Sequence, residues 1–115
     1  MEIAIGALER GVRTLAKKLE KLGLKTEITV FKTGPGGTAH YGSSYVELEV
    51  TGTCQGADGE PEEAYATVKF LAGGYGDLHT PGRNIGGMEG WRPMSAEGLK
   101  RILAQLESDG WKRPG

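Results

Sequence analysis

The spacing of the apolar residues changes twice along this 115-residue chain, and that change constrains the fold more than any other feature of the sequence. In residues 5–22 and again in residues 99–106, apolar side chains recur every three or four positions, which places them on one face of an α-helix. In three segments within residues 25–71 they recur at every second position, as in a β-strand with one buried side. The sequence therefore predicts a helix, three consecutive strands and a second helix.

The predicted fold is an α+β two-layer sandwich of αβββα order, in which a three-stranded antiparallel sheet carries two helices packed on one face. Gly23 and Gly110 are expected to end the two helices, because glycine adopts the left-handed conformation of a helix C-cap at little cost. The strand residues expected to face the helices are Ile28, Val30, Val46, Leu48, Val50, Ala66, Val68 and Phe70.

The length of the chain predicts a single domain, because 115 residues can bury one hydrophobic core without disulfides or a structural metal. We expect this domain in residues 1–111, with a long loop at residues 72–94 that holds seven glycines, and a flexible tail in residues 112–115. The single cysteine, Cys54, cannot form an internal disulfide and has no neighbours at zinc-ligand spacing. No run is apolar enough to span a bilayer and no secretory signal is present, so we expect a cytoplasmic protein without metal, cofactor or membrane partner.

The charges are sorted along the chain, although the net charge is only -1. Residues 47–78 contain seven carboxylates and one lysine, whereas the segments on either side carry more basic than acidic residues. Glu47 and Glu49 are expected on the outward face of the second strand, together with the aromatic Phe31 and Tyr65 of the neighbouring strands. Four of the other five acidic residues of this segment are expected in the loop that follows, and they are Asp58, Glu60, Glu62 and Glu63.

These acidic and aromatic residues are candidates for binding another protein that has a basic surface. The corresponding function is a small non-catalytic regulatory module, such as an inhibitor of a nucleic-acid-binding protein whose phosphate groove the carboxylates would fill. The 20 glycines and the single asparagine are typical of GC-rich bacterial and phage genes. A solvated, solubilising strand face has the same pattern, and the aromatic residues are equally compatible with a homodimer.

Nucleic-acid binding is the alternative function. Four basic residues on the first predicted helix, spaced three or four apart, form a stripe that could contact phosphates, although ordinary solvation explains the same pattern. They are Arg10, Arg13, Lys17 and Lys21.

A loop motif adds to this alternative. Gly34, Pro35 and His40, followed by the strand at residues 45–50, resemble the Gly-Pro-x-His loop and second strand of double-stranded RNA-binding domains. That resemblance covers about a third of the chain and implies that the 34–40 loop would enter the minor groove of an RNA duplex. Three extra residues separate Pro35 from His40, and residues 94–97 lack the lysine cluster of the family. The resemblance therefore stays a secondary interpretation.

Two further patterns bear on small ligands and catalysis. The long loop contains Asp77, His79, Arg83 and Trp91, which could form a site for a small anion if the glycine backbone approached it. For catalysis, the only nucleophile near a potential base would be Cys54 with His40 or His79, and a lone cysteine at a strand end is more typically a small buried apolar residue. The third strand also lacks the carboxylate that restriction-type nucleases place two residues before a lysine. We therefore expect no catalytic residues.

Overall fold

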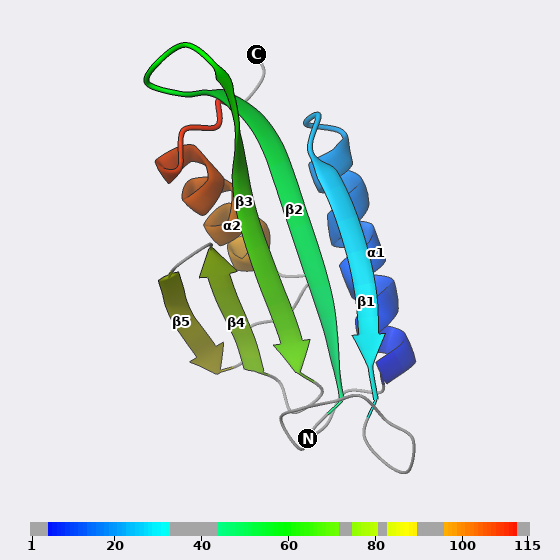
Figure 1. Ribbon diagram of the computed structural model, residues 1–115. Helices are drawn as coiled ribbons and strands as arrows, with labels where there is room; N and C mark the ends of the chain where they lie inside the picture. The colour runs from blue at the N-terminus through cyan, green and yellow to red at the C-terminus, as the bar shows by residue number, and fades with distance from the viewer. Residues whose placement is uncertain (1–4, 33–43, 72–74, 81–82, 90–95, 113–115) are drawn as a thin grey trace.

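A computed structural model describes residues 5–32, 44–71, 75–80, 83–89 and 96–112; within residues 75–97 it describes the backbone alone. Two helices and five strands follow one another along the chain (Figure 1). Their bounds are α1 Ile5–Glu20, β1 Lys25–Phe31, β2 Tyr45–Gln55, β3 Pro61–Leu71, β4 Tyr75–Thr80, β5 Arg83–Glu89 and α2 Ala96–Ser108. Neither helix in these residues has the length and apolar character needed to cross a lipid bilayer.

The strands form one antiparallel sheet in the order β1-β2-β3-β4-β5, so each strand pairs with its neighbour in the sequence. β2 and β3 are the longest strands, with 11 residues each, and their ladder runs from Tyr45 opposite Leu71 to Gln55 opposite Pro61. The far end of this hairpin extends beyond the other strands (Figure 1). The predicted α+β class, with two helices and consecutive antiparallel strands, is confirmed.

The sheet continues beyond the three predicted strands. Much of the expected 72–94 loop forms the β4–β5 hairpin, so the prediction of a loop is wrong for residues 75–80 and 83–89. Glycines hide these strands from pattern analysis, because Gly76 and Gly86, in the cross-strand rows of the buried Phe70 and Val68, occupy positions where an apolar side chain would mark the inner face. β3 also begins at Pro61, so Glu62 and Glu63 lie on a strand and not in the predicted loop.

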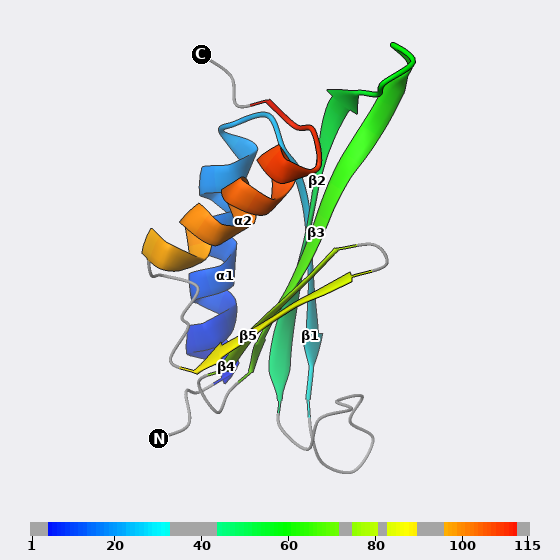
Figure 2. The ribbon, with the colours of Figure 1, turned by 90° about the vertical axis from the view of Figure 1, so that its left-hand side faces the viewer.

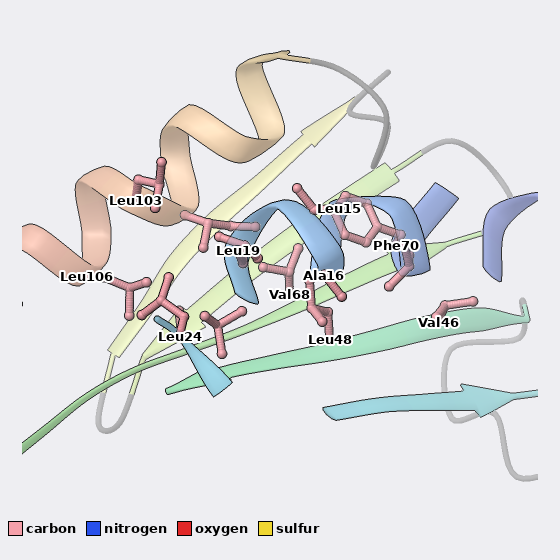
Figure 3. Packing of buried hydrophobic residues seen from close by; sticks show 14 of the residues in the cluster. Leu15, Ala16, Leu19, Leu24, Val46, Leu48, Val68, Phe70, Leu103 and Leu106 are labelled. Atoms are coloured by element: carbon pink, nitrogen blue, oxygen red, sulfur yellow. The ribbon is translucent and has the colours of Figure 1, made fainter. Parts of the chain in front are cut away.

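Both helices cover the same face of the sheet (Figure 2). Side chains from α1, α2, β2 and β3 meet between these layers, as Figure 3 shows for Leu15, Leu48 and Phe70. The core includes six of the eight strand residues predicted to face inward, while Ile28 and Val30 of β1 pack against it and remain partly exposed. The opposite face of the sheet has no helix over it in the described part of the chain.

The two helices end in the same way. After α1, the N–H of Gly23 donates to the carbonyl of Glu20 and the N–H of Leu24 to that of Leu19. This pair of bonds is the Schellman motif, with Gly23 in the left-handed region at φ 86°. The apolar residue after the glycine then folds back onto the core, where Leu24 is 3% exposed.

At the end of α2, Gly110 has φ 109° and Trp111 donates its N–H to the carbonyl of Leu106. Trp111 is 5% exposed. The two predicted helix stops are therefore confirmed.

The apolar residues that follow the two helix-ending glycines, Leu24 and Trp111, both pack against Gly52 of β2. A Cβ atom at Gly52 would lie 2.6 Å from Cδ1 of Trp111 and 2.7 Å from Cδ2 of Leu24. Both distances are shorter than real Cβ contacts, so the absence of a side chain at this position provides the space into which both helix ends pack.

Candidate protein-binding surface

The sheet face opposite the helices holds the candidate surface. Successive residues of a strand alternate between faces, and the register aligns Phe31, Tyr45 and Leu71 in one cross-strand row. The next row contains Thr29, Glu47 and Lys69, and the row after it contains Glu27, Glu49 and Thr67.

An apolar cluster lies at one end of this face. The rings of Phe31 and Tyr45 stack with their centroids 4.6 Å apart and an angle of 16° between their planes. Phe31 and Leu71 remain partly exposed, whereas Tyr45 is only 2% exposed. The sequence pattern placed Phe31 on this face but did not identify Tyr45 as its partner, because the pairing depends on the register set by the long connection between β1 and β2.

A chain of hydrogen bonds connects β2 and β3 in the middle of the face. The hydroxyl of Tyr65 donates to Oε1 of Glu49 at 3.0 Å and accepts a bond from Oγ1 of Thr67 at 2.8 Å. The bond from Thr67 has the largest single effect and lowers the pKa of Tyr65. Burial, the bond to Glu49 and the negative charges of Glu49 and Glu47 together outweigh it, so the pKa of Tyr65 is raised above its usual 10.0. Tyr65 therefore stays neutral and positions the Glu49 carboxylate.

The tip of the β2–β3 hairpin presents further acidic residues. Asp58 accepts a 3.0 Å hydrogen bond from the N–H of Glu60, which closes the turn beside Gly59 at φ 84°. Asp58 thus has a structural role that accounts for its position. The side chain of Glu60 is exposed at the tip.

The strand register divides the predicted acidic residues between two faces. Glu63, opposite Thr53, shares the outer face with Glu47 and Glu49, whereas Glu62 lies opposite Cys54 on the helix side. A Cβ at Gly56 would lie 2.5 Å from the carboxyl carbon of Glu62, so this side chain packs along the hairpin. The candidate surface, which we call the acidic face, therefore consists of Glu47, Glu49, Glu63 and Tyr65, with Phe31 at its apolar end and the exposed Glu60 at the hairpin tip.

Lys69 is the basic residue of β3 on this face, directly opposite Glu47 in the register. Within the described residues, no hydrogen bond or ion pair engages the carboxylates of Glu47, Glu60 or Glu63.

The residues proposed for an anion site in the long loop do not share a loop. Asp77 and His79 lie on β4, opposite Lys69 and Thr67 of β3, and Arg83 begins β5 opposite Thr80. Trp91 falls outside the described residues. The loop placement of these three residues is therefore wrong, because they belong to the ladder of a sheet, whereas anion binding by them stays a prediction.

The basic stripe of the first helix is exposed, as predicted, at Arg10, Arg13, Lys17 and Lys21. Nη2 of Arg13 lies 2.9 Å from the carboxylate of Glu9 one turn earlier. The loop at residues 34–40, which carries the resemblance to RNA-binding domains, lies outside the described residues, so its part in nucleic-acid binding stays a prediction.

Cys54 lines a cavity near the turn of the β2–β3 hairpin. This cavity has a volume of about 460 Å³ and is lined by the hairpin and by the end of α2, including Gly110 and Lys112. The Cys54 sulfur is a free, partly exposed thiol 4.0 Å from the carbonyl oxygen of Asp109. No group of three or more His, Cys, Asp or Glu side chains in the described ranges is arranged to hold a metal ion.

Comparison with known proteins gives no further guide to function. No protein-family model, curated protein or solved structure matches this chain.

Proposed function

We propose that this chain is a small non-catalytic binding protein that engages a basic surface of another protein through its acidic face. The observation that carries the proposal is the group of carboxylates at Glu47, Glu60 and Glu63, which have no partner among the described residues. Glu47 and Glu63 lie on the sheet face that has no helix over it in the described part of the chain, and Glu60 is exposed at the hairpin tip.

The surface combines features of a protein interface. The partly exposed Phe31 and Leu71 supply apolar contact area beside the acidic groups. The bond from Tyr65 orients Glu49 before any partner arrives, which lowers the entropy cost of binding. A complementary partner therefore carries Lys or Arg groups beside an apolar patch.

Nucleic-acid-binding proteins present such basic surfaces, because they neutralise phosphates with Lys and Arg. We propose that the acidic face occupies a surface of this kind and so acts as an inhibitor or regulator. The free thiol of Cys54 fits the cytoplasmic location that forms part of this proposal.

The test is affinity capture from bacterial lysate with the wild-type chain and two charge-reversal variants, in the presence of nuclease. Glu63→Lys changes the acidic face, and Glu62→Lys makes the same charge change at the next residue, on the other side of the strand. A protein captured by the wild type and by Glu62→Lys, but lost with Glu63→Lys and with Glu47→Lys, supports the proposal. Its purified form should bind less tightly as salt concentration rises.

Two results would contradict the proposal. Equal capture by all variants would show that the acidic face is not the interface. Capture that disappears on nuclease treatment, together with direct binding of duplex RNA that is lost in Lys17→Glu, would favour the nucleic-acid alternative.

A further inference from the structure

A second surface lies at the edge of the sheet, away from the acidic face. β1 pairs with β2 on one side, and among the described residues it is the last strand of the sheet on the other (Figure 1). An edge strand of seven residues directs alternate N–H and C=O groups away from its neighbour, where another extended chain can pair with them.

A groove runs beside this edge, between β1 and α1. Its volume is about 290 Å³, and it is lined by Arg13, Ala16, Lys17, Glu20, Thr26 and Ile28. The hydroxyl of Thr26 donates to Oε2 of Glu20 at 3.0 Å, which joins the helix and the strand at one end of the groove. The groove is therefore bounded on both sides by ordered elements.

The floor of the groove is incompletely covered. Ile28 and Val30 pack against the core but stay partly exposed, unlike the equivalent residues Leu48 and Val46 of β2, which are fully buried. A strand added beside β1 would place every second side chain on the helix side, so carboxylate side chains there lie with their methylene groups next to this apolar strip and their charges toward α1.

The wall formed by α1 is basic. Residues 5–25 contain six Lys or Arg and two Glu, and of these Lys17 and Arg13 line the groove. The Arg13–Glu9 pair is solvent-exposed, with 59% and 34% of the two side chains accessible, and exposed pairs of this type contribute little to stability. An incoming carboxylate can replace Glu9 at low cost. Glu20 is already engaged by Thr26.

We propose that the free edge of β1 accepts an extended acidic segment of a partner protein as a sixth strand, with carboxylates directed at Lys17 and Arg13. A second copy of this chain fits the edge poorly, because a symmetric β1–β1 pairing would bring two basic α1 walls together. On the side away from β2, the main chain of β1 pairs with no other strand in the described residues, and main-chain pairing there favours a polypeptide over a nucleic acid. This inference concerns a different surface and does not depend on the proposed function.

The probe is a fluorescent seven-residue peptide that alternates valine and glutamate, matching the length of β1. A second peptide has lysine in place of glutamate, and a third has the valine–glutamate sequence with alternate backbone nitrogens methylated, which removes N–H donors and keeps the charge. Fluorescence anisotropy measures their affinity for the wild-type chain, Lys17→Glu and Lys18→Glu. Lys18 is the matched control, because it is an exposed neighbour on the same helix that does not line the groove.

We expect the acidic peptide to bind and both control peptides to bind at least about tenfold more weakly. Lys17→Glu should weaken binding of the acidic peptide about tenfold, whereas Lys18→Glu should change it less than about twofold. Backbone NMR of the complex should show chemical-shift changes concentrated in β1.

Four outcomes would overturn the proposal. If the acidic peptide does not bind the wild-type chain, the proposal is wrong. If Lys17→Glu and Lys18→Glu weaken binding equally, the peptide is attracted by the overall charge of the helix and not by the groove. Unchanged affinity of the methylated peptide would exclude strand addition. A concentration-dependent dimer that blocks the peptide would assign the edge to a second copy of the chain.

Discussion

At the scale of single residues, Gly52 joins distant parts of the sequence, because Leu24 and Trp111 both pack where its side chain would be. Gly52→Ala should lower the free energy of unfolding by about 1–3 kcal/mol, since the added methyl group forces one or both neighbours out of position. Urea denaturation followed by circular dichroism measures this change.

A double-mutant cycle provides the control for Gly52→Ala. Trp111→Phe removes ring atoms close to the added methyl group, so the two substitutions together should cost less than the sum of their separate effects. Strict additivity, or a neutral Gly52→Ala, would contradict the close packing at this position.

Tyr65 is the second residue with a measurable consequence. Because its pKa is raised in the folded chain, its neutral hydroxyl stabilises the fold fully below the unfolded value near pH 10.0. This contribution is lost as the pH rises through the folded-state pKa. The stability difference between wild type and Tyr65→Phe should therefore shrink in alkaline solution.

The Glu49→Gln variant separates the causes of this pKa shift. Removing the Glu49 charge should lower the pKa of Tyr65, as measured by tyrosinate absorbance with Tyr65→Phe as the reference. An unchanged titration in Glu49→Gln would show that the carboxylate does not act on the hydroxyl.

At the scale of elements, the sequence predicted the helices and strands in which apolar and polar side chains recur with a regular period. Both helices and the inward rows of β2 and β3 follow from apolar spacing, and the helix stops follow from Gly23 and Gly110. β4 and β5 were not predicted, because glycines stand where apolar residues would have shown the alternation of a strand. The start of β3 was also not predicted, because Glu62 and Glu63 are both exposed and polar, so no apolar residue shows the alternation there.

The candidate site shows the same limit. Alternation placed Glu47, Glu49 and Tyr65 on one face, but only the register could separate Glu63 from Glu62 and show that Tyr65 binds Glu49. Asp58 belongs to the turn because of a local hydrogen bond, which its charge alone did not reveal.

The helix caps give a prediction at this scale. Gly23→Ala and Gly110→Ala should each destabilise the fold by about 1–2 kcal/mol, because both positions have positive φ angles that an L-residue adopts at a cost. Gly6→Ala is the control, since this exposed residue of α1 has helical geometry and alanine there should be neutral or stabilising by up to about 1 kcal/mol. Thermal unfolding of the three variants gives the comparison. Equal effects at all three positions would contradict the role of the caps.

At the scale of the whole molecule, the net charge of -1 conceals two surfaces of opposite sign. The acidic face lies on one side of the sheet, and the basic groove lies between β1 and the helix on the other side. Long-range attraction between such surfaces and their partners is screened within about 8 Å at physiological salt. The two surfaces should therefore act independently.

This independence is testable with the variants already described. Glu63→Lys should leave affinity for the acidic peptide within about twofold of wild type at physiological salt, and Lys17→Glu should leave partner capture by the acidic face intact. A change larger than about tenfold in either cross-test would indicate that one surface controls the other.

The packing of both helix caps against one strand glycine has a consequence for how this sequence can diverge. A larger residue at position 52 is compatible with the fold only if position 24 or position 111 becomes smaller, because all three compete for one volume. In any set of related chains, these three positions should therefore change together, although 28 and 59 residues separate them along the sequence. Such covariation would identify the fold in relatives whose glycine-rich strands leave no recognisable pattern.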